Sequence, residues 1–212
     1  MKIRSKIPVI SNGFLYKKYY KSKLFGSDLY IRERILKINS FDYKNNASLV
    51  YTKIIDFGCY YLYMQSIVDI KKIAKIEKDE FIDLCDSLEY LDEIKFVHGD
   101  LNRKNIIYTK YGFRIVDYEP SINQVIDGIN KLMVTPPYIS NIDLNNKCIT
   151  VRTDKIGFYY FVLRVNKHLT SDDVVMLSRN RDHYSFIKMN ELEFENISYR
   201  DILYLAYEHM CF

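Results

Sequence analysis

The sequence contains little glycine and no closely spaced cysteines. Only 7 of its 212 residues are Gly, so few loops can adopt backbone conformations with positive φ. The cysteines form no CxxC pair, which argues against a zinc ligand set and a disulfide framework; they are Cys59, Cys85, Cys148 and Cys211. Free cysteines of this kind suit a reducing compartment.

Long apolar runs and a basic stripe are also missing. The longest apolar run, Ile156–Leu163, is too short to span a bilayer, and the N-terminal MKIRSKIPVIS lacks the features of a secretory signal. The net charge is only +4, with Lys and Arg spread among acidic residues, whereas nucleic-acid-binding proteins concentrate basic residues on one face. We therefore expect a cytoplasmic protein with no membrane span and no nucleic-acid partner. Export as a host-directed effector stays open, because specialised secretion does not require a signal peptide.

The residues that are present indicate an α+β fold. Hydrophobic residues make up 48% and charged residues 27% of the chain, which supports a packed core. Strand patterns come first, with one helix among them, and helix patterns follow. The predicted strands are 3–10, 14–20, 49–55, 60–68 and the short pair 106–108 and 113–116; the predicted helices are 27–37, 79–95, 154–165 and 198–209. This order predicts one domain with two lobes, residues 1–68 and 69–212.

One polar loop carries the chemistry. Residues 97–107 read VHGDLNRKNII, so that Asn105 follows Asp100 by five positions, and Asp117 comes after a short apolar strand. Phosphoryl transfer from a nucleotide requires a carboxylate near the attacking hydroxyl, and oxygen ligands that hold Mg²⁺ against the phosphates. An Asp and an Asn on one loop, with an Asp from the adjacent hairpin, supply these groups.

Residues 97–117 resemble the catalytic and metal-binding loops of the protein-kinase-like superfamily. The resemblance implies that Asp100 is the catalytic base and that Asn105 and Asp117 are ligands of Mg²⁺ or Mn²⁺, with ATP as the phosphate donor. It also implies that His98 shapes the loop and that Ile107 lies under the adenine ring. Lys104 would be the cation that reaches the transferring phosphate.

The resemblance extends downstream. Residues 134–140 read VTPPYIS, similar to the segment that follows the activation loop and shapes the substrate groove, and include Thr135, Pro137 and Tyr138. Asp154 then opens DKIGFYYFVLRV, which looks like the buried helix whose first Asp braces the catalytic loop. The implied fold has two lobes, a reduced N-lobe sheet without the glycine-rich loop and a truncated helical C-lobe.

Upstream, the resemblance implies a nucleotide site. Period-two alternation in the strand 14–20 favours Lys17 as the phosphate-binding lysine, and Glu33 on the next helix as its ion-pair partner. The strand that ends near Met64 would place this residue as the gatekeeper. The hinge that binds adenine through its backbone would then be Gln65, Ser66 and Ile67.

The chain departs from the family pattern in several places. No GxGxxG precedes Lys17, so we expect weak nucleotide affinity unless an activating or site-covering partner closes the site. Gly99 stands where regulated kinases carry Arg, so activity should not require activation-loop phosphorylation and should survive replacement of Ser121 and Thr135 by Ala. Asn102 stands where Ser/Thr kinases commonly have Lys, which weakens the substrate assignment.

Three functions fit these motifs. The first is a minimal Ser/Thr protein kinase, resembling those that some bacterial pathogens deliver as effectors, with a protein substrate. The second is a small-molecule or lipopolysaccharide-sugar kinase, favoured by Glu119, because an acidic residue two places after the metal-binding Asp is similar to aminoglycoside and choline kinases. The third is a pseudokinase or regulatory binding module, favoured by the missing glycine loop.

Overall fold

The structure, a computed structural model, contains a four-stranded antiparallel sheet beside a group of helices. It describes residues 8–24, 27–71, 76, 78–119, 138–146, 148–170, 172–174, 176 and 191–210. The sheet has the order β1-β2-β4-β3, with β1 at Val9–Ser11, β2 at Phe14–Tyr20, β4 at Tyr60–Ser66 and β3 at Thr52–Asp56. Helix α1, Asp28–Asn39, packs against β3.

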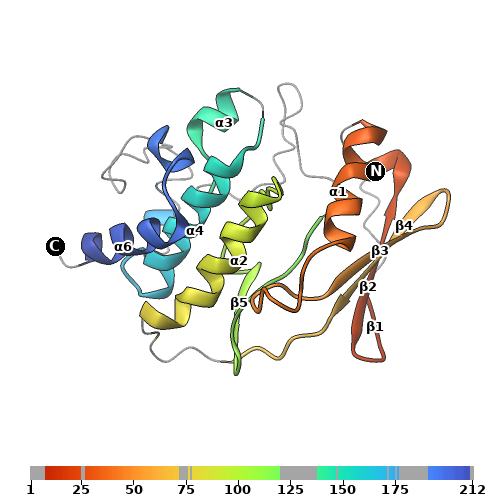
Figure 1. The fold of residues 1–212 in the computed structure, drawn as a ribbon, viewed down its shortest axis with the longest axis horizontal. Helices are drawn as coiled ribbons and strands as arrows, with labels where there is room; N and C mark the ends of the chain where they lie inside the picture. Colours follow the sequence, from red (N-terminus) through yellow and green to blue (C-terminus); the bar gives the residue numbers. More distant parts are fainter. Residues whose placement is uncertain are drawn as a thin grey trace.

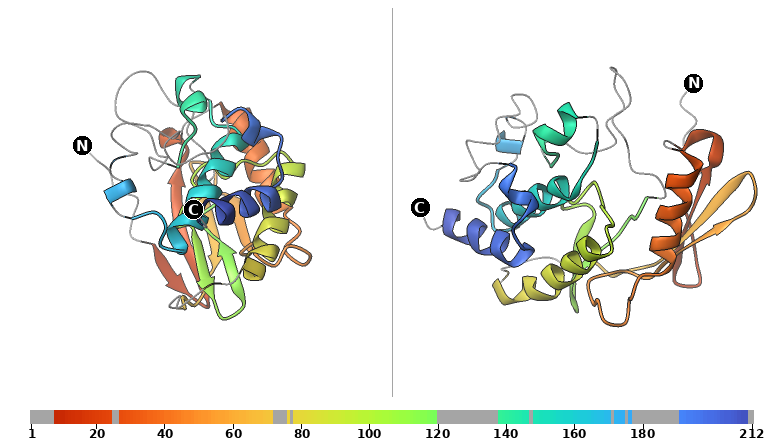
Figure 2. Two further views of the ribbon diagram at one scale, coloured as in Figure 1. Left: turned by 90° about the vertical axis from the view of Figure 1, so that its left-hand side faces the viewer. Right: turned by 45° about the horizontal axis from the view of Figure 1, so that its top comes forward.

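The later part of the described chain is mainly helical. It contains α2 (Ile82–Glu93), α3 (Asn141–Asn145), α4 (Val151–Val165), α6 (Tyr199–Met210) and the hairpin of β5 (Ile106–Thr109) and β6 (Gly112–Ile115). Short 3₁₀ turns lie at Lys21–Lys23 (η1), Lys78–Phe81 (η2) and Glu193–Glu195 (η4). Figures 1 and 2 show the sheet and α1 at one end and α2, α4 and α6 at the other, with β5 between them.

This architecture is α+β, as the sequence predicts; the division at residue 68 stays a prediction. Residues 3–7 of the first predicted strand, 3–10, lie outside the described residues. In the described part a strand is found at Val9–Ser11. Within the described part of the chain, no helix is both long and apolar enough to cross a membrane.

Local sequence explains two boundaries that matter for the site. Asn12 and Gly13 adopt positive φ values of 49° and 78° and form a two-residue turn between β1 and β2. Helix α4 begins at Val151, because the side chain of Thr150 caps it by accepting the N–H of Arg152. Asp154 therefore lies one turn inside the helix, and its predicted place as the first helical residue is wrong.

A short backbone junction ties the sheet to the β5–β6 hairpin. The N–H of Ile115 donates to the carbonyl of Ser48 at 2.7 Å, and the N–H of Val50 donates to the carbonyl of Ile115 at 3.3 Å. Because Ser48 and Val50 lead into β3, and Ile115 lies two residues before Asp117, this junction fixes where Asp117 emerges relative to the sheet.

Helix α4 forms the centre of the helical core. Its residues from Arg152 to Leu163 are all buried, and it packs against α6. Gly157 allows α4 to approach the loop that holds Asp100, because a Cβ atom at this position would lie 2.7 Å from the carbonyl oxygen of Leu101. The helix and the loop are therefore in backbone contact at Gly157.

Gly157→Ala should destabilise the protein. Ala normally stabilises a helix interior relative to Gly by about 1 kcal/mol. Here its methyl group would collide with the Leu101 carbonyl, so we expect a net loss of about 1–3 kcal/mol in the free energy of unfolding. Urea unfolding of the two proteins measures this difference. A variant as stable as wild type, or more stable, would show that the contact is loose.

Candidate active site

The carboxylate of Asp100 is held by two side-chain amides. Asn102 Nδ2 donates to one carboxylate oxygen at 2.7 Å, and Asn105 Nδ2 donates to the other at 2.8 Å. Both amides also donate to the Asp100 carbonyl, at 3.2 Å and 2.9 Å. Since Asn102 is buried and Asp100 only partly buried, the carboxylate is oriented from the protein side.

A second carboxylate fixes the backbone of the same loop. Asp154 on α4 accepts the N–H of His98 at 2.6 Å and the N–H of Gly99 at 2.7 Å. Its side chain is almost fully buried, so these bonds are shielded from water. Gly99 has φ of 82°, a conformation that glycine adopts without strain. Asp154 thus contacts the loop that it was predicted to hold in place.

His98 connects this loop to the strand before Asp117. Burial lowers the pKa of His98 to about 4, so the ring is neutral near pH 7. Its Nε2 lies 3.0 Å from the Val116 carbonyl, and its Nδ1 accepts the N–H of Asp100 at 3.3 Å. A proton on Nε2 satisfies both contacts, because this nitrogen then donates and the other accepts.

Lys17 and Asp117 form an ion pair between β2 and the end of the β5–β6 hairpin. Asp117 has a positive φ of 65°, and its N–H donates to the side-chain oxygen of Gln65 at 2.8 Å. A non-glycine residue in this region is uncommon and is held there by its surroundings. Both charged side chains are partly exposed, at 20% for Lys17 and 32% for Asp117.

Tyr118 anchors the chain directly after Asp117. Its side chain is fully buried, and its hydroxyl donates to the Ile115 carbonyl at 3.0 Å. Its N–H donates to the hydroxyl of Tyr63 at 3.1 Å, and its ring meets His98 edge to face at 5.5 Å. The backbone at Asp117, the predicted metal ligand, is therefore held by hydrogen bonds of Asp117 itself and of Tyr118.

These contacts bring together four of the predicted residues from distant parts of the sequence. Lys17 pairs with Asp117. The preceding Val116 donates its N–H to the Asn105 carbonyl at 2.9 Å, and Asn105 holds Asp100. The candidate base, the two candidate oxygen ligands and the candidate cation therefore lie along one path of hydrogen bonds and one ion pair.

Glu33 is not part of this path. Helix α1 buries Ile31, Arg34, Ile35 and Ile38 at helical spacing, which leaves Glu33 exposed. In the described part of the chain Glu33 forms no ion pair with Lys17, which is paired with Asp117, so the predicted partnership is wrong for this structure.

Arg34 occupies the inward position on α1 and joins the helix to both loops. Its Nε donates to the Glu119 carbonyl and its Nη1 to the Val97 carbonyl, each at 2.7 Å. Its guanidinium lies over the ring of Phe96, 4.1 Å from the centroid. Cation and aromatic ring attract at this distance, and Arg34 was not among the predicted site residues.

Glu119 is an acid that lies inside the site. It accepts the hydroxyl of Tyr19 at 3.0 Å. Burial and the nearby charge of Asp117 raise the pKa of Glu119 to about 7, although Lys17 and Arg34 act in the opposite direction.

The strand register changes the predicted gatekeeper. Opposite residues of an antiparallel pair share a face, and the pairs Lys17↔Tyr63 and Leu15↔Gln65 put Gln65 on the face of Lys17. Met64 pairs with Tyr16 and therefore lies on the other face, so its predicted gatekeeper position is wrong. Alternation along β2 alone indicates the face of Lys17, whereas the face of Met64 depends on the register between β2 and β4.

Backbone N–H groups of the predicted hinge are already hydrogen-bonded within the protein. The N–H of Ser66 donates to the Tyr51 carbonyl and the N–H of Ile67 to the Gly13 carbonyl, each at 2.9 Å. The Gln65 side chain accepts from Tyr63 and from the N–H of Asp117. Neither the Ser66 nor the Ile67 N–H is thus left for an adenine ring in this structure.

The other predicted residues lie around this centre. Lys104 is exposed and its N–H donates to Asn102 Oδ1 at 2.8 Å, while Ile107 is half-buried on β5. Tyr138 is buried beside Tyr160, with ring centroids 6.4 Å apart. Ser121, Thr135 and Pro137 lie outside the described residues.

A buried acid near α4 was also missed. Asp143 is 1% exposed and pairs with Arg152 at 2.7 Å. Thr150 and Thr153 donate their hydroxyls to the same carboxylate. The kinase resemblance implies a Glu at Ile142, one position before Asp143.

Comparison with known proteins gives one partial likeness. The chain is 28% identical over 147 residues to a protein of Acanthamoeba polyphaga mimivirus named "putative serine/threonine-protein kinase", a match that covers 61% of this chain and 21% of that protein. The chain thus spans about a fifth of the length of this relative. No family model matches the chain. The likeness indicates a distant kinase-like relationship and goes no further.

Asp154 and His98 should give opposite pH dependences of stability. Burial raises the pKa of Asp154 to about 7 from 3.8, against the lowering effect of its two N–H donors, so its contribution is lost as pH rises from 3.8 to 7. The pKa of His98 falls from 6.5 to about 4, so its contribution is lost as pH falls through that range.

Asp154→Asn should reveal the two trends. The variant lacks the titrating carboxylate of Asp154 and keeps His98. The difference in the free energy of unfolding between wild type and variant should therefore be largest near pH 4. The gap should shrink by up to ~1.4 kcal/mol per pH unit towards pH 7. Urea unfolding at a series of pH values measures the gap. A gap that is constant with pH would contradict the buried, titrating carboxylate.

Proposed function

We propose that the chain is an ATP-dependent phosphotransferase, acting as a small Ser/Thr protein kinase. One observation supports this most: Asp100, Asn105, Asp117 and Lys17 lie along one connected path although they come from three separate segments. The partial likeness to a protein named as a kinase points to the same class.

Asp100 would orient the attacking hydroxyl and accept its proton. Its carboxylate is held by Asn102 and Asn105, so little reorganisation is needed when a hydroxyl arrives, and positioning of this kind carries much of phosphoryl-transfer catalysis. Lys104, exposed beside the loop, would be the cation that reaches the transferring phosphate.

The oxygen donors fit Mg²⁺ or Mn²⁺. The Asp117 carboxylate and the Asn105 side-chain oxygen belong to residues linked through the Val116 to Asn105 hydrogen bond, and hard cations prefer such oxygen ligands. In the described residues no group of three His, Cys, Asp or Glu side chains forms a metal cluster; Mg²⁺ in nucleotide sites usually takes one or two carboxylates plus phosphate oxygens. When bound, the ion would neutralise phosphate charge.

Lys17 would bind the phosphates after leaving Asp117. The ion pair between them is partly exposed, so separating the two charges costs little. The two-residue turn at Asn12 and Gly13 is too short to cover a nucleotide. We therefore propose a nucleotide affinity that is weak unless a partner covers the site.

The adenine contacts would lie one step beyond the predicted hinge. Gln65 shares the face of Lys17 and would be the gatekeeper. The N–H groups of Ser66 and Ile67 are bonded within the protein, while no described backbone hydrogen bond occupies those of Val68–Ile70. This segment would provide the backbone contacts, with Ile107 below the ring.

The small-molecule alternative rested on Glu119. In the structure this acid accepts from Tyr19, and its backbone carbonyl accepts from Arg34. An internal bracing role accounts for it without a small-molecule substrate, so we favour a protein substrate.

Transfer of labelled phosphate tests the function. Wild-type protein with Mg²⁺ and γ-labelled ATP should label itself or a generic protein substrate, and Asp100→Asn should reduce the rate by about 10²–10⁴-fold. Asp79→Asn is the matched control, because Asp79 is exposed on η2, and it should retain the wild-type rate. Label appearing only in sugars or lipids would favour the small-molecule kinase. No turnover by a folded wild type, with candidate partners added, would favour the binding module.

Asn102→Ala should lower kcat without an equal rise in the KM for ATP. The variant removes one of the two amides that hold the Asp100 carboxylate, and it leaves Lys17 and Asp117 in place. We expect a loss of about tenfold or more in kcat, comparable with one charge-assisted hydrogen bond. Steady-state kinetics separates the two constants. A change confined to KM would place Asn102 in nucleotide binding instead.

A further inference from the structure

The four-stranded sheet has an outer face, on the side opposite Lys17. It consists of the even-numbered residues of β2 and the residues paired with them across β1, β4 and β3. The four residues of β4 on this face are partly exposed, whereas Tyr61, Tyr63 and Gln65 between them are buried. Figures 1 and 2 show α1 on the other side of the sheet, towards the rest of the molecule. The outer face therefore remains accessible to a partner.

Aromatic rings follow one another across this face. Phe57, in the turn between β3 and β4, is 50% exposed and stacks on Tyr60, with ring centroids 5.3 Å apart and ring planes at 13°. Tyr60 lies 6.1 Å from Tyr20 on the neighbouring strand, and Tyr16 and Phe14 lie further along β2, 6.4 Å apart. Partly exposed rings of this kind form a platform on which nucleic-acid bases can stack.

Lysines lie among these rings. Lys18 Nζ is 4.8 Å from the centroid of Tyr60, and Lys23 Nζ is 5.7 Å from the centroid of Tyr20. Lys53 is exposed on the same face. Among the described residues that the strand register places on this face, none is Asp or Glu. The outer face therefore combines aromatic rings with positive charge alone.

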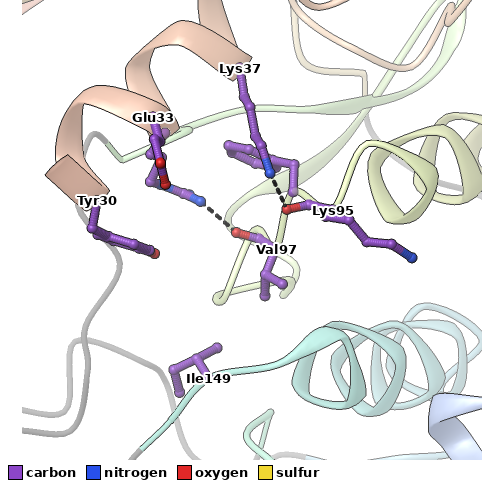
Figure 3. Close-up of a pocket in the computed structure, with 8 residues that line it drawn as sticks. Tyr30, Glu33, Lys37, Lys95, Val97 and Ile149 are labelled. Carbon is purple, nitrogen blue, oxygen red and sulfur yellow. Dashed lines mark hydrogen bonds between the residues drawn. The ribbon is translucent and has the colours of Figure 1, made fainter.

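The cations of α1 differ, because the backbone of the protein binds them. Arg34 donates to the Val97 carbonyl at 2.7 Å and Lys37 to the Lys95 carbonyl at 2.8 Å, and Figure 3 shows both hydrogen bonds. Within the described part of the chain, Lys18 and Lys53 form no ion pair and no side-chain hydrogen bond. Their charges are available to the phosphate groups of a ligand.

We propose that the outer face of the sheet binds single-stranded nucleic acid. Bases would stack on Phe57 and on the neighbouring tyrosines, while Lys18 and Lys53 would contact phosphates. A single strand presents open base faces beside a chain of phosphates, so it matches rings and lysines that lie side by side. A second copy of the same face would bring like charges together, which disfavours self-association.

This proposal revises one expectation from the sequence and does not depend on the proposed function. Basic residues are spread along the chain, and for this reason we expected no nucleic-acid partner. The sheet nevertheless gathers Lys18, Lys23 and Lys53 around one row of rings.

Fluorescence anisotropy of a labelled uridine oligonucleotide of about 12 nucleotides tests the binding. Titrated with the full chain without ATP, it should saturate with a Kd of about 1–100 µM at ~0.1 M salt. Phe57→Ala should weaken binding about tenfold and unfold near the wild-type temperature, because the ring lies in an exposed turn. Tyr111→Ala is the matched control: Tyr111 is 69% exposed and has Lys110 over its ring, but lies outside this sheet. It should bind as wild type does.

The salt dependence tests the two lysines separately from the rings. Replacing both Lys18 and Lys53 by Gln should reduce the slope of log K against log salt by about 1.4, because each phosphate contact of a single strand contributes about 0.7. Lys110→Gln should leave the slope unchanged. A duplex of the same length should bind more weakly, because its base faces are hidden. The deoxy form of the oligonucleotide distinguishes RNA from DNA, and saturable binding of either supports the proposal.

Several results would overturn the proposal. These are no saturable binding by wild type, wild-type affinity in Phe57→Ala, or a duplex that binds as tightly as the single strand. Displacement of the oligonucleotide by ATP and Mg²⁺ would place it in the proposed nucleotide site instead. Binding only to anionic lipid vesicles would assign the face to a membrane surface, and self-association lost in Phe57→Ala without oligonucleotide binding would assign it to a second copy. Since the titration contains no ATP, a lack of kinase activity would not affect its result.

Discussion

The arrangement of the candidate site depends on the carboxylate of Asp154. It accepts two consecutive backbone N–H groups, of His98 and Gly99, inside the protein, where an unpaired N–H is costly. The loop can therefore take one path past α4, and Gly157 lets the helix come close enough to hold it. Asp100 follows directly, so the same two hydrogen bonds position the backbone that carries it.

A second set of hydrogen bonds connects this loop to α1 and to the sheet. Arg34 joins α1 to the backbone on both sides of the site, at Val97 and Glu119. Gln65 and Tyr63 on β4 accept the N–H groups of Asp117 and Tyr118. In this structure α1 is thus coupled to the site through a buried arginine and backbone carbonyls, and an ion pair from Glu33 to Lys17 is not used. This coupling runs through hydrogen bonds within the protein.

The sequence predicted the parts of this site that are local. The spacing of Asp100, Asn105 and Asp117 lies within one loop and hairpin. Alternation along one strand singled out Lys17, which the structure pairs with Asp117 and not with Glu33. The predictions for Glu33 and Met64 were wrong because they depend on distant partners. Glu33 is exposed because backbone carbonyls bind Arg34 on the inner face of α1. Met64 is displaced because the strand register puts Gln65 on the face of Lys17. Arg34 was recoverable in part, since it shares helical spacing with Ile31, Ile35 and Ile38, but a buried arginine is recognisable only once its acceptors are known. Its acceptors lie more than 60 positions away in the chain.

The central claim is that the Asp100 loop is ordered by buried contacts before any ligand binds. Amide hydrogen exchange of His98 and Gly99 in the ligand-free full chain tests it most directly. The account predicts exchange as slow as that of the buried residues of α4, because both N–H groups are bonded to a buried carboxylate. Exchange as fast as that of the exposed turn at Gly58 would contradict it.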